Sequence, residues 1–173
     1  MRTRAAVLEV VGADRPYARS RPIAVTELDL AGPQEAELLV RVEAAGVCHS
    51  DLSVVDGNRV RPVPMALGHE AAGEVVEVGA GVTDVRPGDH VVLVFVPACR
   101  GCAHCTGGTP ALCSAAAAAN TAGTLLRGGH RLHRDGAPVH HHLGVSAFSE
   151  YAVVDRASAV VISDDVPWAA AAL

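Results

Sequence analysis

The chain has 173 residues, enough for one full domain and the beginning of a second. Half of the residues are apolar, yet none of the apolar runs approaches the roughly 18 residues that a membrane helix needs. Residues 1–4 lead into the first apolar run without a signal-peptide pattern, so we expect a cytoplasmic protein. The net charge of −5, with arginines scattered and lysine absent, argues against a nucleic-acid surface.

Short β-branched or alternating segments separated by Gly and Pro breaks dominate the first two-thirds of the chain. The predicted strands are residues 5–11, 23–30, 37–42, 73–78, 90–96 and 147–154. A short helix is predicted over residues 50–55 and another begins at 165–173, while the alanines of 115–119 suggest a loop or a helical turn. This pattern predicts a mainly β fold, a compact barrel or sandwich.

Four cysteines, Cys99, Cys102, Cys105 and Cys113, follow the spacing C-x₂-C-x₂-C-x₇-C within residues 97–115. Four thiolates around one point suit a tetrahedral Zn²⁺, which supplies folding energy when it binds. Disulfides are the less favoured alternative, because a cytoplasmic protein seldom oxidises its thiols. An iron–sulfur cluster is a second alternative, since thiolates also bind such clusters. We predict a structural zinc lobe.

A second group of chemically versatile residues comprises Cys48, within a Gly-Val-Cys-His-Ser-Asp string, and His69, within Gly-His-Glu. Cysteine and histidine are good zinc ligands, and adjacent glycines permit sharp backbone turns. Their separation in sequence is by itself weak support for a metal site. A buried thiol and an ordinary core or surface histidine remain the alternative.

These strings resemble motifs of the medium-chain, zinc-dependent alcohol dehydrogenases. Residues 46–51, 68–79 and 82–92, the four-cysteine lobe and residues 143–154 follow in the order of that family. The resemblance covers nearly the whole chain. It implies a GroES-like β-barrel catalytic domain over residues 1–163, with short helices and the zinc lobe. Residues 164–173 would then begin a helix leading toward the family's Rossmann domain, which is absent from this sequence.

The resemblance also implies roles for individual residues. Cys48 and His69 would be two of three protein ligands of a catalytic zinc, which binds the alcohol oxygen and acidifies it. Ser50 would hydrogen-bond that oxygen and take its proton, although a serine there could also cap the helix. Asp51 would orient the histidine ligand. Glu70 would lie behind the metal and approach it only when the ligands rearrange.

Three further positions are assigned by the same resemblance. His49 would face the pyrophosphate of the cofactor, as a pH-dependent anchor. Phe95 would be an aromatic wall of the alcohol pocket, and His142 would lie near that pocket. The triplet of residues 140–142 suggests a metal site, but consecutive residues of an extended chain point in alternating directions, so we do not expect a third zinc there.

The sequence departs from the family pattern in three respects. Ser53 stands where well-known members have a histidine that relays protons to solvent. The family's third zinc ligand, usually a cysteine, follows the helix that begins near Trp168 and does not occur before Leu173. A dinucleotide fingerprint is also missing, because Gly79 and Gly81 are followed by Asp84 where a third glycine would stand.

The sequence thus predicts the catalytic domain of an enzyme that oxidises an alcohol to an aldehyde or ketone by hydride transfer to NAD or NADP, and that is inactive as these 173 residues alone. The alternative is a non-catalytic zinc-binding module that assembles with a separate partner chain. Zinc-free quinone-reductase relatives are disfavoured, since they would leave both cysteine-containing motifs unused. Polyol, threonine and thiol-linked formaldehyde dehydrogenases remain possible branches. Full-length relatives are homo-oligomers, and the sequence specifies neither oligomeric state nor natural substrate.

Overall fold

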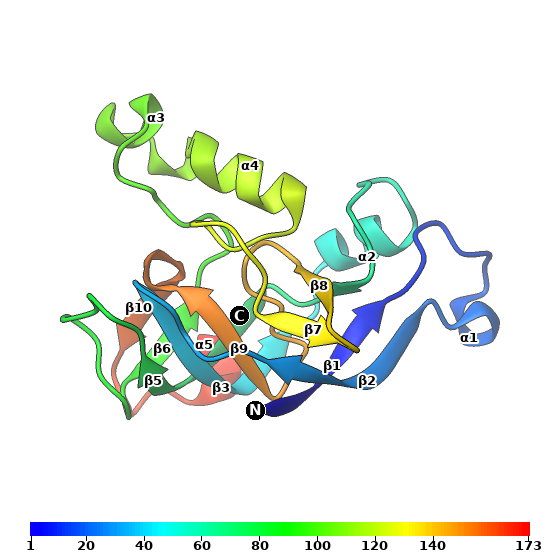
Figure 1. The fold of residues 1–173 in the computed structure, drawn as a ribbon, viewed down its shortest axis with the longest axis horizontal. Helices are drawn as coiled ribbons and strands as arrows, with labels where there is room; N and C mark the ends of the chain where they lie inside the picture. Colours follow the sequence, from blue (N-terminus) through cyan, green and yellow to red (C-terminus); the bar gives the residue numbers. More distant parts are fainter.

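The computed structural model describes residues 1–173, which form a closed five-stranded barrel, a five-stranded sheet and a helical lobe (Figure 1). The barrel has the strand order β1-β2-β7-β8-β4 and the sheet the order β10-β6-β5-β3-β9. The strands are β1 (Arg2–Leu8), β2 (Ile23–Leu30), β3 (Glu37–Gly46), β4 (Met65–Ala66), β5 (Glu70–Val78), β6 (His90–Leu93), β7 (Leu132–Arg134), β8 (Ala137–His141), β9 (Tyr151–Asp155) and β10 (Ala159–Ile162). The helices are α1 (Tyr17–Ser20), α2 (His49–Val55), α3 (Ala103–Thr106), α4 (Ser114–Ala122) and α5 (Trp168–Ala171), with 3₁₀ turns at Pro110–Leu112 and Arg156–Ser158.

Alternating side chains give the barrel its interior. In β1, Thr3, Ala5 and Val7 are buried while Arg2 and Arg4 face solvent, as a strand with one covered face requires. Leucines of β2, β7 and the segment before β7 fill the same core. Leu39 of β3 also packs there, whereas its neighbours Leu38 and Val40 belong to the core of the second sheet. The two sheets are therefore coupled through β3.

A buried ion pair links the second sheet to the barrel. The Arg131 guanidinium, just before β7, donates to both carboxylate oxygens of Glu37 at the start of β3, over 2.8 and 2.6 Å. Both side chains are largely removed from water. A charge buried in this way requires a close partner, because its desolvation is costly. The pair fixes the first residue of β3 and thereby the strand that leads to Cys48.

All six predicted strands are present, most with shifted ends. Residues 23–30 match β2, while the predicted strand at 37–42 continues to Gly46. The residues beyond 42 pair with β5 after a β-bulge. At Gly73 of β5 a Cβ would collide with the Arg41 carbonyl oxygen, so only glycine fits where the two strands approach so closely. The predicted strand at 147–154 begins later, at Tyr151. Tertiary pairing sets these ends, and local sequence does not encode it.

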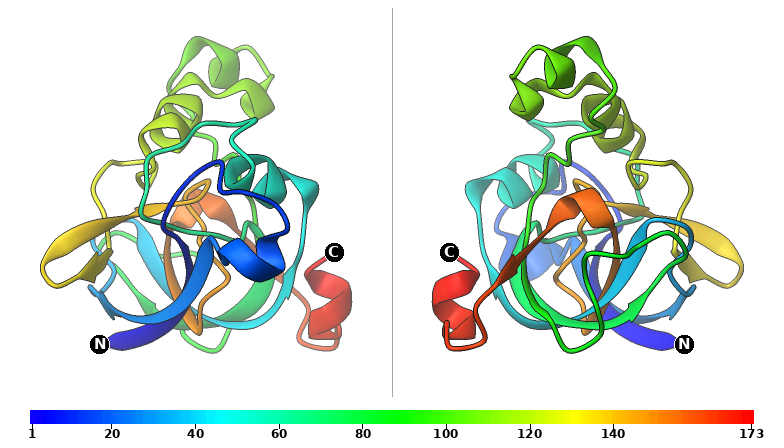
Figure 2. Two further views of the ribbon diagram at one scale, coloured as in Figure 1. Left: turned by 90° about the vertical axis from the view of Figure 1, so that its right-hand side faces the viewer. Right: turned by 90° about the vertical axis from the view of Figure 1, so that its left-hand side faces the viewer.

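The helices also differ in length from the expectation. The alanine patch forms the central part of α4, a nine-residue helix that ends at Gly123 in the left-handed region. The helix expected within 165–173 is limited to the four residues of α5, which packs against β3 and β5 of the five-stranded sheet (Figure 2). The α3–α4 lobe projects from the two sheets in the same views. None of the helices is long and apolar enough to cross a membrane.

His141 provides a pH-dependent contribution to stability. Its ring is buried, and Nε2 accepts a hydrogen bond of 3.0 Å from the Arg131 backbone N–H. Burial, aided by the charges of His130 and Arg131, lowers the pKa of His141 to about 3. The unfolded chain binds this proton near pH 6.5, so folded stability falls as the pH drops below that value and the loss levels off near pH 3.

We therefore expect a His141→Gln variant to lose less stability on acidification. Between pH 7 and pH 5 its decrease in the free energy of unfolding should be smaller than that of the wild type by about 2 kcal/mol. Urea unfolding at both pH values measures this difference. His104→Gln, at an exposed position on α3, is the control and should behave as the wild type. An unchanged pH dependence in His141→Gln would contradict the assignment.

Candidate metal centres and active site

The four cysteines of the lobe converge on one point. Their sulfur atoms all lie within 4.8 Å of one another, and the Cys99–Cys105 and Cys102–Cys113 sulfurs are each 4.0 Å apart. Sulfurs placed about 2.3 Å from a tetrahedral ion are about 3.8 Å from one another. All five cysteines of the chain are free thiols, which removes the disulfide alternative. The arrangement fits a single Zn²⁺.

Backbone N–H groups of the lobe stabilise the thiolate forms. The N–H of Cys99 points at the Cys113 sulfur over 3.4 Å, and that of Cys102 at the Cys99 sulfur over 3.4 Å. The Cys105 N–H is the main cause that lowers the pKa of Cys102 to about 5. Desolvation, followed by the neighbouring Cys102 sulfur, instead raises the pKa of Cys105 to about 12. Ionising all four thiols therefore calls for a cation at their centre.

The second centre follows from the register of β3 and β5. Gly46, the last residue of β3, pairs with Glu70, the first of β5, so that the chain segments just beyond each strand meet. Cys48 is the N-cap residue of α2, and His69 immediately precedes β5. The donor atoms of Cys48, His69 and Glu70 all lie within 4.8 Å of one another. The structure thus brings Glu70 close to the two predicted ligands.

Gly68 gives His69 its position. Its φ of +92° is in the left-handed region, and a Cβ there would lie 2.4 Å from the Phe148 backbone nitrogen. Only glycine tolerates this conformation at such close approach. The Gly68 N–H donates to Asp51 Oδ1 over 3.0 Å, which anchors the turn to α2.

Asp51 is the buried carboxylate between two histidines. Its Oδ2 lies 3.3 Å from Nδ1 of His69, and its Oδ1 lies 3.0 Å from Nδ1 of His142. The exposed fractions are 4 % for Asp51, 2 % for His69 and 0 % for His142. A carboxylate at Nδ1 fixes the ring and leaves Nε2 of His69 free to bind a metal, which is compatible with the role that the family resemblance implies for Asp51.

The pKa values of this trio reflect burial opposed by charge. Burial acts to raise the pKa of Asp51, but the contacts with His142, His69 and the Gly68 N–H outweigh it and hold that pKa well below its usual range. Burial acts to lower the pKa of His69, yet Asp51 and Cys48 raise it overall. For His142 burial prevails, so its pKa is lowered despite Asp51. Asp51 is the ionised member of the group.

The histidine triplet diverges as expected for extended chain. Nδ1 of His140 lies 3.1 Å from Nε2 of His130, while Nε2 of His141 accepts from Arg131. The sequence places His142 near the alcohol pocket. In the structure its ring lies behind His69, with the ring centroids 5.2 Å apart, and it contacts Asp51. This contact depends on tertiary structure, and no sequence motif marks it.

The other predicted site residues lie around the start of α2. Cys48 is the N-cap, so Ser50 lies inside the first turn and does not cap the helix. His49 is exposed, and the Ser53 hydroxyl lies 3.4 Å from its Nδ1. Phe95 is 44 % exposed, and its ring centroid is 5.4 Å from that of His69. Phe95 thus forms a wall beside the buried histidine.

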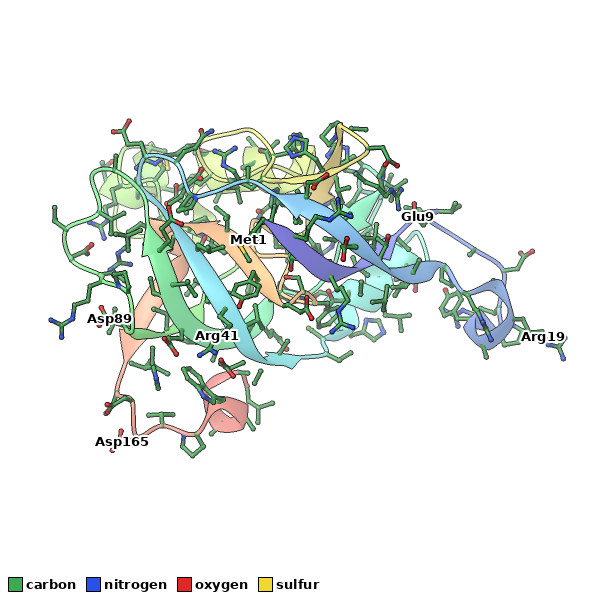
Figure 3. All side chains as sticks on the ribbon, turned by 60° about the horizontal axis from the view of Figure 1, so that its bottom comes forward. Met1, Glu9, Arg19, Arg41, Asp89 and Asp165 are labelled. Atoms are coloured by element: carbon green, nitrogen blue, oxygen red, sulfur yellow. The ribbon has the colours of Figure 1, made fainter.

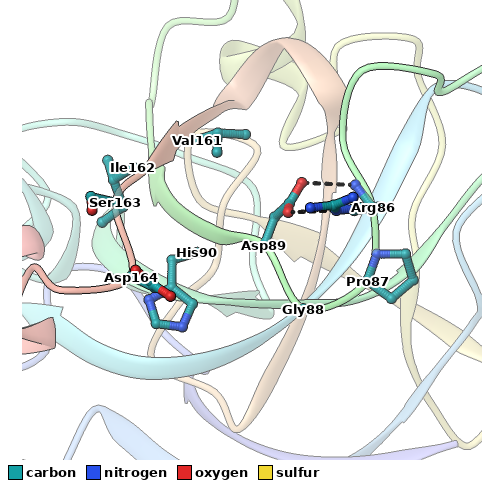
Figure 4. Close-up of a pocket in the computed structure, with 9 residues that line it drawn as sticks. All are labelled: Arg86, Pro87, Gly88, Asp89, His90, Val161, Ile162, Ser163 and Asp164. Atoms are coloured by element: carbon teal, nitrogen blue, oxygen red, sulfur yellow. Dashed lines mark hydrogen bonds and ion pairs between the residues drawn. The ribbon is translucent and has the colours of Figure 1, made fainter.

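Two cavities differ in their relation to these residues. One, of about 460 Å³, lies between the turn of residues 86–90 and residues 161–164 (Figure 4). It contains none of the predicted ligands, and Asp89 in it interacts with Arg86 of the same turn. The other, of about 370 Å³, is lined by Phe95, Leu143 and residues of α4. Because Phe95 also contacts His69, this cavity adjoins the second metal centre.

Comparison with known proteins agrees with this geometry. Residues 34–164 match the family model of the alcohol dehydrogenase GroES-like domain. The chain belongs to this family.

Individual relatives are dehydrogenases. The chain is 40 % identical over 170 residues to S-(hydroxymethyl)glutathione dehydrogenase of Paracoccus denitrificans, covering 97 % of this chain and 43 % of the relative. It is 40 % identical over 178 residues to NDMA-dependent alcohol dehydrogenase of Amycolatopsis methanolica, covering 100 % and 44 %. The structure of benzyl alcohol dehydrogenase from Acinetobacter calcoaceticus superposes with a TM-score of 0.83 at 35 % identity, covering 97 % and 43 %. The chain spans less than half the length of these relatives.

For the four-cysteine centre we expect Cys102→Ser to lose one zinc ion and much stability. Removing one thiolate from a closed tetrahedral site forfeits metal-linked folding energy, and we expect a loss of more than about 4 kcal/mol. Denaturant unfolding with zinc counting by native mass spectrometry measures both effects. Cys48→Ser, at the one cysteine outside the lobe, is the matched control and should lose less stability. Unchanged zinc content and stability in Cys102→Ser would refute the structural site.

For the second centre we expect Asp51→Asn to weaken zinc binding roughly 10- to 100-fold, because the amide no longer holds Nδ1 of His69 as a charged acceptor. Competition against a chelator of known affinity measures the change, and the four-cysteine zinc serves as an internal reference. Asp84→Asn, at an exposed carboxylate paired with Arg156, should leave both affinities unchanged. Wild-type affinity in Asp51→Asn would show that the carboxylate does not support a ligand.

Proposed function

We propose that residues 1–163 form the catalytic domain of a zinc-dependent alcohol dehydrogenase. It would oxidise an alcohol to an aldehyde or ketone by hydride transfer to NAD or NADP. The observation that carries this proposal is the donor set of Cys48, His69 and Glu70, with Asp51 at the back of the imidazole and an open aromatic wall beside it. Membership of the alcohol dehydrogenase GroES-like family supports it.

The roles of the side chains follow from their positions. When bound, zinc supplies a Lewis acid that lowers the pKa of an alcohol hydroxyl. Asp51 keeps the His69 ring oriented, and Cys48 supplies a thiolate from the start of α2. Ser50, the second residue of α2, would accept the proton of the alcohol. Glu70 would lie behind the metal and approach it only when the ligands rearrange, and its donor atom lies within 4.8 Å of those of Cys48 and His69.

A nicotinamide cofactor would be held chiefly by residues that this sequence does not contain. His49 would contribute a contact to its pyrophosphate, for it is exposed at the beginning of α2. Residues 164–173 would lead toward the nucleotide-binding domain. The carbonyl oxygen of Ala172 lies 3.1 Å from the Cβ position of Gly46, near Glu70, so chain that follows α5 would start close to the metal centre. A third zinc ligand would come from there.

The test is a zinc count paired with an activity assay. The dehydrogenase proposal expects two zinc ions per complete wild-type chain by native mass spectrometry and one in His69→Ala, whose remaining zinc is in the lobe. A non-catalytic module would carry a single zinc in both proteins. We also expect the purified 173-residue chain to give no NAD-dependent oxidation of ethanol or benzyl alcohol. Measurable turnover would disprove the claim that it needs a nucleotide-binding domain.

A further inference from the structure

The cavity beside Phe95 contains an unusual pair of cations. Arg59 and Arg61 lie on the loop between α2 and β4, which runs alongside α4 (Figure 2). Pro62 of this loop lies 3.0 Å from the Cβ position of Gly123 at the end of α4, so the loop and the helix are in close contact. Most other lining residues are apolar, and the volume of about 370 Å³ is sufficient for a small organic ligand.

Neither arginine has an acidic partner, although most arginines of this chain form ion pairs. Arg61 donates through Nη1 only to the neighbouring Val60 carbonyl oxygen, over 3.1 Å, and its Nε is buried without a polar partner. Burial, followed by the charge of Arg59, lowers the pKa of Arg61. Arg59 is exposed and its charge is solvated, whereas Arg61 is partly buried beside that like charge, so an anion between the two would stabilise chiefly Arg61.

The cavity is positioned to hold one end of a substrate. Phe95 lines it and also contacts the His69 ring, while Leu143 lines it directly after His142. The Asn120 side-chain amide of α4 donates to the Phe95 carbonyl oxygen over 3.1 Å and fixes this wall. A ligand could therefore extend from the metal centre past Phe95 to the arginines.

We propose that Arg59 and Arg61 form an anion subsite, and that the substrate is an alcohol with an apolar body and a carboxylate or phosphate group. The guanidinium fork matches both oxyanions. The identity of the substrate as an alcohol rests on the proposed dehydrogenase function. Binding of an oxyanion by the two arginines does not depend on that function. The apolar wall would hold the body of the substrate and orient its hydroxyl toward His69.

The test uses probes that lack a hydroxyl and therefore cannot react. We would titrate 4-methylbenzoate, phenyl phosphate and the neutral 4-methylbenzamide into the 173-residue chain. Calorimetry gives Kd, and amide NMR shifts locate the site. We expect at least one anion to bind, with Kd at least about tenfold lower than that of the amide, because charge-assisted hydrogen bonds are the stronger ones. Comparison of the two anions shows whether carboxylate or phosphate is preferred.

The Arg59→Gln/Arg61→Gln variant should bind the preferred anion about tenfold more weakly. Arg19→Gln is the matched control, since Arg19 is unpaired and projects on α1 away from the barrel (Figure 3), and it should bind as the wild type. The double variant should keep its melting temperature, because it loses no ion pair. The subsite would be overturned if the double variant bound the preferred anion with the Kd of the wild type. It would also be overturned if the wild type bound the amide as tightly as the anions, or if it showed no saturable anion binding. Anion binding by a chain that holds only one zinc would contradict the proposed dehydrogenase function and leave the anion subsite standing.

Discussion

The buried Asp51 carboxylate is the constraint on which the candidate active site depends. It belongs to α2, yet it accepts the Gly68 N–H and lies against Nδ1 of both His69 and His142. One residue thus joins the helix that begins at Cys48 to the turn that carries the histidine ligand. Because an ionised carboxylate this deep is stable only with close partners, the helix and the turn are held in a fixed relation.

The two metal centres are built on different physical principles. The four-cysteine lobe has its donors close together in sequence, and backbone N–H groups of the same segment point at the sulfurs. The other centre draws its donors from two segments distant in sequence that meet at one end of the β3–β5 pair, so it exists only when that pair is formed. The first can stabilise a local segment when metal binds. The second is positioned by the core, and the half-exposed Phe95 ring lies beside its histidine.

The α3–α4 lobe has a second role besides holding sulfur atoms. Its helix α4 fixes the Phe95 backbone through Asn120 and forms one side of the cavity that Arg59 and Arg61 complete. The four-cysteine lobe and the cavity beside Phe95 therefore share a wall. A change in the packing of the lobe would therefore also change the shape of the cavity.

The sequence by itself determined the elements that depend on local pattern. Cysteine spacing predicted the lobe, alternation predicted most strands, and ordered motifs predicted the family and Cys48 with His69. Other features were decided only by tertiary structure. The ends of β3, the contact of His142 with Asp51 and the unpaired state of Arg59 and Arg61 all depend on segments distant in sequence. Local residue patterns report how a segment can fold, whereas the partners of a buried charge or of a strand end are set by which segments the packed core brings together.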